Sequence, residues 1–451
     1  MSYRVHILWI SLLIVFCLIF SNAWAVTDED LARLGKDLTP IGAEKAGNEK
    51  GTIPAWEGGL TTPPANYVPG EYRVDPYTED KVLFTITADN MDQYGDNLTQ
   101  SHKEMLKRYS TFRMNIYPTR RSAGYPERIY ETTKLYAKGA QMDPLGGFRN
   151  IVQGIPFPIP ASGAEVMANY QARYRGESSK KTYHQLVVQE NGSYTPVKMS
   201  EVFYNKYHLP DMTLDQLDFI LYYKQYVHAP PRLAGQIVLL HEPTGYSDYD
   251  RTVWTYNPGQ RRVRRAPNYE HDNPGTGSDG LFTVDQKNQW SGKTERYDWT
   301  LIGKKEMYVP YNDYASVTDK VKLKDLIRPL HLNPDHLRYE LHRVWIVDAT
   351  LKEGAKHLYK KRRYYFDEDS WHPLVQDIYD NEDKFWRFTE SHCMSYYDVP
   401  TFMMAYETHM DLLSKRYNVS QLVNETEPID FTVKFDLKEF TTSAIRMEGR
   451  R

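Results

Sequence analysis

Three glycines, Gly275, Gly277 and Gly280, have the spacing G-x-G-x-x-G, which in dinucleotide-binding proteins lets the backbone approach a pyrophosphate. That chemistry needs a strand before the glycines and a helix after them, because the helix N-terminus supplies the N–H donors. Here the turn-forming residues 272–274 precede the motif, and residues 281–284, which favour a strand, follow it. The stretch therefore predicts a flexible surface loop that could close over a ligand, and no nucleotide cofactor.

No grouping of nucleophile, base and acid stands out along the chain. Thr276 occupies the position where a nucleophile elbow, G-x-S-x-G, would need its first glycine. With 59 acidic residues and 14 histidines, chance pairs are unavoidable, so the sequence nominates no catalytic residue. We therefore expect a protein that is not an enzyme.

Two stretches have the residue types of a metal site. His331, His336 and His342 are five and six residues apart, with Pro334 between them, whereas a helical zinc site places its ligands four residues apart. The acidic run 367–369 falls between two expected strands, where a solvated turn is the simpler interpretation. We predict no metal at either place.

Arginines gather in one expected strand and form a basic patch. Such a run suits anionic headgroups or an acidic partner, or it forms a solvated strand face, and the sequence leaves these alternatives open. The chain as a whole is close to neutral, because 56 basic residues oppose 59 acidic ones. That balance argues against nucleic-acid binding. The patch comprises Arg261, Arg262, Arg264 and Arg265.

The elements that must position these residues are mostly strands. From about residue 164 onward, apolar alternation is broken every few residues by short turns, which predicts an antiparallel meander. The 36 tyrosines suit such a sheet, since tyrosine favours strands. We expect helices at 321–327 and 403–413. The fold class is therefore mainly β with α, of the α+β kind.

The N-terminal part of the chain divides into three segments. Residues 1–25 have a basic start, an apolar run of about 14 residues and alanines at 23 and 25, which is the layout of a secretory signal peptide. Residues 26–163 read as loops and helices that wrap a body formed by 164–451. Within them, the proline-rich stretch 146–160 must be extended, and we expect it to lie across the body as a strap. No later segment is apolar enough to cross a membrane.

Several sequence blocks together resemble the proteobacterial family called domain of unknown function 1329. They cover nearly all of the chain after the signal peptide. The blocks include LTPIGAEKAGN at 38–48, GTIPAW at 51–56, YNPGQRRVRR at 256–265, GKKEMYVPYN at 303–312 and RRYYFDEDSW at 362–371.

The resemblance implies a fold like that of the lipoprotein-sorting carriers LolA and LolB, which are unclosed β half-barrels with helices across the mouth. It also implies a periplasmic carrier of a lipid or other hydrophobic molecule, with a peripheral position at the outer membrane as an option. An RND-type inner-membrane transporter and an outer-membrane protein are the implied partners. No catalytic residue is carried over, because the family defines none.

A half-barrel would bury an acyl chain on its concave face, at about 0.8 kcal/mol per CH₂. Strand alternation selects candidate lining residues, although the same side chains would equally suit a closed core. An assembly partner without a ligand and an envelope hydrolase remain as alternative functions. The candidate lining is Trp254, Tyr256, Trp299, Trp345, Val347, Tyr364 and Phe366, and the candidate lid is Phe148, Ile151, Ile155 and Phe157.

Overall fold

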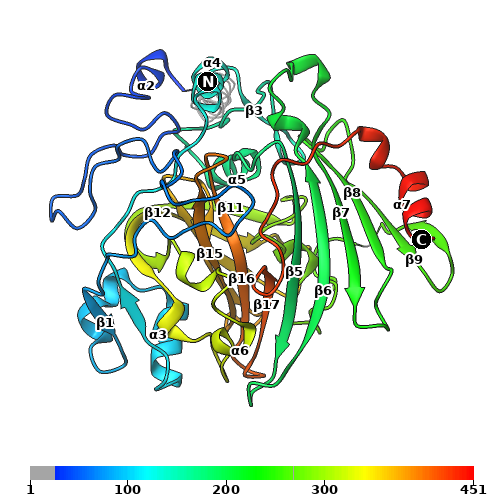
Figure 1. The fold of residues 1–451 in the computed structure, drawn as a ribbon. Coiled ribbons are helices and arrows are strands. Elements are labelled where there is room, and N and C mark those ends of the chain that lie inside the picture. The colour runs from blue at the N-terminus through cyan, green and yellow to red at the C-terminus, as the bar shows by residue number, and fades with distance from the viewer. Residues whose placement is uncertain (1–25, 268, 451) are drawn as a thin grey trace, which may run out of the picture.

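A computed structural model describes residues 26–267 and 269–450, which form one sheet of 15 strands with helices around it (Figure 1). Two antiparallel meanders account for most of the sheet. The first contains β5 (Ser178–Val188), β6 (Tyr194–Tyr204), β7 (Phe219–Ala229), β8 (Ile237–Pro243), β9 (Thr252–Asn257) and β10 (Arg262–Arg265). The second contains β11 (Tyr297–Pro310), β12 (Tyr339–Leu351), β13 (Lys361–Asp367), β14 (Pro373–Tyr379), β15 (Phe385–Tyr396), β16 (Thr401–Asp411) and β17 (Arg416–Leu422).

The two meanders join where β17 pairs with β5, with Val419 opposite Leu186. At the far ends of the joined meanders lie β10 and β11, and these strands do not pair with each other. The sheet is therefore open along one side. This arrangement confirms the predicted fold class, a large curved antiparallel sheet that is not closed.

Strand β16 replaces the helix that the sequence predicted over 403–413, so that prediction is wrong. The strand pairs with β15 along almost its whole length, from Thr401 opposite Tyr396 to Asp411 opposite Arg387. Nearly every residue of β16 is buried, because both faces of the sheet are covered there. A strand buried on both faces shows no polar alternation, and a short apolar run then does not distinguish a strand from a helix.

The N-terminal region adds strands to the sheet as well as covering it. Strand β1 (Phe84–Ile86) pairs with β2 (Met114–Ile116), and Ile116 meets Tyr339 of β12 in a parallel pair. Among the strands of the described residues, β3 (Gln141–Met142) and β4 (Phe148–Arg149) form a separate pair outside the main sheet.

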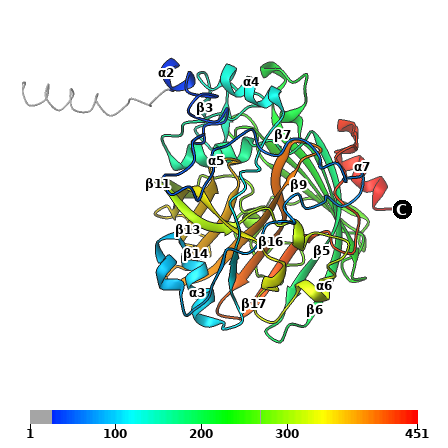
Figure 2. The same cartoon turned by 60° about the vertical axis from the view of Figure 1, so that its left-hand side comes forward.

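The helices of the described residues are short, and two of them lie next to the central part of the sheet. Figures 1 and 2 both place α5 (Gly163–Ala172) across the upper end of the sheet and α7 (Thr442–Glu448) against its outer side. The others are α2 (Asp28–Leu31), α3 (Gln100–Arg108), α4 (Glu127–Tyr136) and α6 (Leu323–Leu326). The 3₁₀ helices are Met91–Asn97, which has seven residues, and the single turns Lys206–His208, Leu214–Gln216, Val284–Gln286, Tyr314–Ser316, Pro334–His336 and Leu437–Glu439.

Glycine lets α5 approach the sheet closely. A Cβ on Gly163 would stand 2.7 Å from Val347 Cγ1 and 2.9 Å from the Trp299 backbone, so a side chain would push the helix off β11 and β12. The predicted signal peptide, 1–25, lies outside the described residues. Among the described helices, none has the length and apolar character needed to cross a membrane.

Candidate functional site

A cavity lies on the inner face of strands β5 to β8. Residues 269–292, here called the covering segment, close it on the side opposite the sheet, and the end of α5 closes it at one edge. The cavity has a volume of about 100 Å³ and is partly open to solvent. Apolar cavities of about 150 Å³ take up molecules the size of benzene, so this space suits a small apolar molecule or one stretch of a lipid chain.

Strand alternation decides which side chains face the cavity. Tyr223 and Leu240 project inward to line it, whereas their neighbours Tyr222 and Leu239 project outward. The outward side chains pack beneath α7 together with Phe440. The sheet is thus covered on both faces here, and the inner face supplies the apolar wall. That wall consists of Phe203, Ile220, Leu221, Tyr223, Val238 and Leu240.

The covering segment is packed against the sheet, so the predicted flexible surface loop is wrong. Ser278 is fully buried, and the ring of Phe282 stacks on His409 with centroids 4.4 Å apart. Gly277 has a φ of +68°, and a Cβ there would stand 3.2 Å from Met199 Cε of β6. The sequence favoured a strand for the apolar residues after the glycines. In the structure these residues anchor the covering segment over the cavity.

Charged groups collect at one side of the cavity. Arg173 and Arg175, which directly follow α5, both line it. Arg251 Nη1 lies 2.7 Å from Glu242 Oε2, so this pair is internally neutral. Lys287 donates to the hydroxyl of Tyr223 and pairs with a neighbouring glutamate of β6. The cavity therefore combines an apolar wall with a cationic side.

Comparison with known proteins places the chain in a family. A family model described as "Protein of unknown function (DUF1329)" matches residues 85–446. The chain belongs to the DUF1329 family. An uncharacterized protein of Pseudomonas aeruginosa is 44% identical over 431 residues, which are 95% of each chain. The family resemblance predicted from the sequence is confirmed.

Solved structures similar to this DUF1329 protein include two with low sequence identity. A DUF1329 family protein from Desulfovibrio piger is 14% identical with a TM-score of 0.44, and the match covers 63% of this chain and 97% of that one. A LolA superfamily protein from Nitrosomonas europaea is 8% identical with a TM-score of 0.37, over 62% and 98% of the two chains.

Five of the aromatic and aliphatic residues predicted to line a cavity lie in or against one packed cluster beneath α5. The register pairs Trp345 with Phe366 and Val347 with Tyr364, as strand alternation predicts. Trp299 packs edge-to-face on Trp290, a cavity residue, with ring centroids 5.0 Å apart. In this DUF1329 protein the five flank the cavity described above and do not line it. A direct ligand contact for them stays a prediction.

The other two predicted lining residues lie on the opposite face of the sheet. Trp254 and Tyr256 pack beneath α7 with Phe440, and Trp254 contacts His241. The inward residue of β9 is their neighbour Val253, which belongs to the cluster on the cavity side. A shift of one residue along a strand exchanges its two faces, and the sequence does not specify which face of β9 is concave.

The proline-rich strap packs against the cavity wall. Phe148, Ile151 and Phe157 are buried in one cluster with the wall residues Leu221 and Leu240. The remaining predicted lid residue, Ile155, is buried in the cluster beneath α5. The strap therefore lies next to the cavity wall, as a lid would. Movement of the strap stays a prediction.

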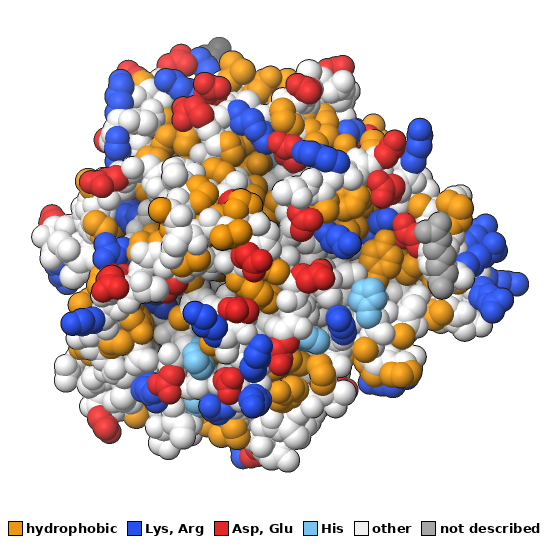
Figure 3. All heavy atoms as spheres, viewed as in Figure 1, with side chains coloured by type: hydrophobic (Ala, Val, Ile, Leu, Met, Phe, Trp, Pro, Cys, Tyr) orange, Lys and Arg blue, Asp and Glu red, His pale blue; other side chains and the backbone are white. Residues whose placement is uncertain are grey.

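The basic patch is exposed at the end of the sheet. Its four arginines occupy the turn before β10 and the strand itself, which pairs on one side only. Figure 3 shows Lys and Arg side chains gathered at the corresponding right-hand edge of the molecule. None of the four forms an ion pair with a described residue. The patch comprises Arg261, Arg262, Arg264 and Arg265.

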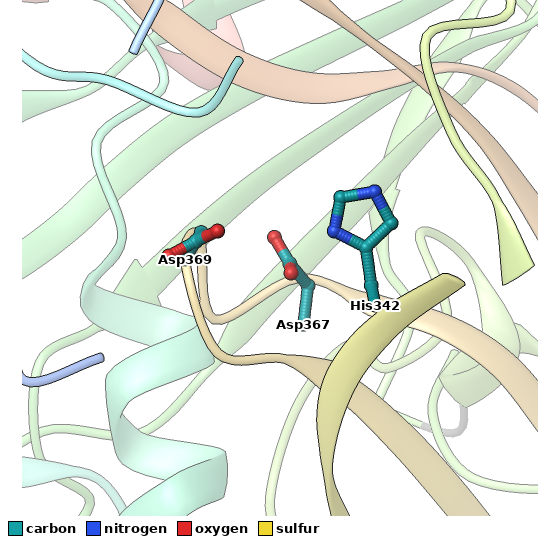
Figure 4. A group of neighbouring side chains, drawn as sticks. All are labelled: His342, Asp367 and Asp369. Carbon is teal, nitrogen blue, oxygen red and sulfur yellow. The ribbon is translucent and has the colours of Figure 1, made fainter. Parts of the chain in front are cut away.

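The acidic run 367–369 is buried, so the solvated turn predicted from the sequence is wrong. Figure 4 shows His342, Asp367 and Asp369 pointing toward one another, with possible ligand atoms within 4.8 Å. Arg121 occupies both oxygens of Asp369, at 2.8 and 2.6 Å. Burial, with the nearby Asp369 charge, raises the pKa of Asp367 to about 7. The group is already partnered by protein, and we do not assign it a metal.

Proposed function

We propose that this protein binds and carries a lipid or another hydrophobic molecule in the cavity beneath the covering segment. The observation that carries the proposal is the cavity of about 100 Å³, open to solvent on one side, with an apolar wall on the inner face of β6 to β8. Moving an acyl chain from water into such a space gains about 0.8 kcal/mol per CH₂. Each methylene group that the cavity takes up therefore strengthens binding without any covalent bond.

Binding rather than catalysis is the proposed activity. The described lining of the cavity offers serines, Ser291 and Ser420, but neither a histidine to activate them nor a cysteine. The proposed location is the periplasm, which is supported by the predicted signal peptide. An accessory role beside an RND-type transporter and an outer-membrane partner follows from the family resemblance alone and is part of the proposal.

A cavity-filling variant tests the proposal. Val238→Trp places an indole in the space, and Val82→Trp, at an exposed site, is the matched control. The neutral fluorophore N-phenyl-1-naphthylamine reports binding. We expect Val238→Trp to weaken binding about tenfold or more, because it removes apolar space, and the control to bind like the wild type. A folded Val238→Trp that binds normally would overturn the proposal.

Native mass spectrometry of protein purified from its own host addresses the natural cargo. We expect a co-purifying amphiphile in the wild type and its depletion in Val238→Trp. Equal amounts in both proteins would show that the molecule sits elsewhere.

A further inference from the structure

Two neighbouring arginines line the cavity without a carboxylate partner. Arg173 is 3% exposed and Arg175 is half-buried. Both also line a smaller adjoining cavity of about 30 Å³. Arg173 Nη1 donates to the Tyr170 carbonyl at 2.7 Å, and its guanidinium lies 4.1 Å from the Tyr170 ring centroid. The Nε atoms of both arginines are buried and have no hydrogen-bond partner in the described chain.

This situation sets Arg173 apart from the other buried arginines of the described chain. Each of the others forms an ion pair with an aspartate or glutamate, whereas neither Arg173 nor Arg175 has a described carboxylate within 4.0 Å. The paired arginines and their partners are Arg73–Asp398, Arg121–Asp369, Arg338–Glu340, Arg343–Glu368, Arg362–Asp285 and Arg387–Asp411.

The charges around the two cavities do not balance. Five cations line them, namely Arg173, Arg175, Lys181, Arg251 and Lys287, against the two carboxylates Glu201 and Glu242, which leaves three positive charges. Both carboxylates are already engaged. Lys181 and Lys287 each lie 3.2 Å from Glu201, and Arg251 holds Glu242. No carboxylate among the lining residues forms an ion pair with either arginine, and the charge of Glu242 offsets that of Arg175 only from a distance.

Neighbouring groups experience this excess of positive charge. Burial, followed by the charge of Arg173, lowers the pKa of Arg175 to about 9. Burial lowers the pKa of His208 and of His372 well below the usual range. The charges of Arg175 and Arg128 lower that of His208 further, and the charges of Arg173 and Arg175 do the same for His372. His372 is fully buried, and neither of its ring nitrogens has a described partner. A buried cation without a counter-charge is costly, which points to an anion supplied from outside the fold.

We propose that the cavity binds an anionic amphiphile, with its acidic head group on Arg173 and Arg175 and its apolar chain along the wall of β6 to β8. Phe203 lines both cavities and so connects the cationic side to the apolar wall. Guanidinium groups bind carboxylates and phosphates in the same planar geometry, so either acid fits the chemistry. This assignment rests on the proposed carrier function and adds the class of ligand to it.

Binding of matched C12 compounds tests the assignment in the full-length mature protein. Laurate, dodecyl phosphate and dodecanol share one chain and differ in the head group, and each displaces N-phenyl-1-naphthylamine in competition. Hydrogen bonds to charged groups are strong, so we expect at least one of the two acids to bind about tenfold or more tightly than dodecanol. The acid that binds more tightly distinguishes a carboxylate from a phosphate ligand.

Charge-removing variants show whether the arginines cause the preference. In Arg173→Gln/Arg175→Gln the preference for the acid should fall to about twofold or less while dodecanol binds as before, because only the head-group contact is lost. The single variant Arg175→Gln, which changes the less buried residue, should lose part of the preference and guards against misfolding of the double variant. Arg264→Gln, at the exposed patch, is the control and should bind like the wild type.

The outcomes separate the two proposals. Equal wild-type affinity for acids and alcohol, or a preference that persists in a folded double variant, would overturn the anion assignment and leave the carrier function standing. Failure of all three compounds and of the fluorophore to bind would overturn the carrier function itself, and the anion assignment with it.

Discussion

Two regions of this molecule bury charge in opposite ways. Around the acidic turn 367–369, the fold supplies a partner for nearly every charge: Arg121 holds Asp369, and Arg343 lies 3.2 Å from Glu368. Asp367 instead becomes easier to protonate, with its pKa raised to about 7, and accepts hydrogen bonds from Tyr311 and Ser370. Beside the cavity, Arg173 and Arg175 are left without any such partner.

The difference separates charges that serve the fold from charges that serve a ligand. Arg121 also donates to the carbonyl of Glu44 at 2.7 Å, so it fastens the N-terminal segment to the body of the protein. A buried ion pair adds little net stability, but breaking one leaves an uncompensated charge. An arginine that was never paired has no such interaction to lose, so the two regions should respond differently to the same substitution.

The largest effect is expected at the paired site. Arg121→Met leaves the buried carboxylate of Asp369 without its cation, and removes the hydrogen bond to Glu44. We expect a loss of about 3–5 kcal/mol in the free energy of unfolding, measured by urea denaturation. Arg33→Met, in the exposed pair with Asp37, is the control and should change stability by less than about 0.5 kcal/mol. Similar midpoints for Arg121→Met and wild type would contradict this view of the acidic turn.

Asp367 should make stability depend on pH. Its pKa is about 7 in the folded protein and 3.8 for an unperturbed aspartate, so between these values the folded state binds the extra proton. The contribution of Asp367 therefore falls as pH rises from about 4 to 7, by at most about 1.4 kcal/mol per pH unit. Asp367→Asn should remove this component from the pH profile of thermal unfolding. The control Asp383→Asn, at an exposed turn, should keep the pH-dependent component of stability. Identical pH profiles for the wild type and Asp367→Asn would contradict the assigned role of Asp367.

The sequence predicted the sheet better than the site. The predicted meander is present, and turn-forming residues at Pro230 and Asn257 mark its β7–β8 and β9–β10 hairpins, because turn chemistry is local. The face of β9 and the burial of the acidic turn depend on α7 and on the segment around Glu44, which lie far away in sequence. Nothing local marks Arg173 as unpaired, since the lack of a partner is a property of the whole fold.

At the unpaired site the same type of substitution should cost little. Arg175→Met removes a cation whose pKa is lowered to about 9 by burial and by Arg173, and it breaks no ion pair. Replacing a poorly compensated buried charge by an apolar side chain is neutral or stabilising, so we expect a change between about 0 and +1 kcal/mol in the ligand-free protein. Urea denaturation of delipidated protein measures it. A loss as large as that expected for Arg121→Met would reveal a counter-charge and would end the contrast between the two regions.

The smallest effect on stability is expected at the exposed basic patch, where charge is neither paired nor buried. Arg262→Gln/Arg264→Gln on the edge strand β10 should change the free energy of unfolding by less than about 0.5 kcal/mol, because water already solvates both groups.

The same double variant tests whether the basic patch binds anionic headgroups. Each arginine near a membrane surface contributes about 1 kcal/mol, so a patch that binds headgroups should bind phosphatidylglycerol vesicles more than tenfold more weakly in this variant than in the wild type, as measured by co-sedimentation. Lys360→Gln, in an exposed pair with Asp383, is the control and should sediment like the wild type. Unchanged sedimentation of the double variant would favour the solvated strand face, and the charge that matters for ligands would then lie only inside the cavity.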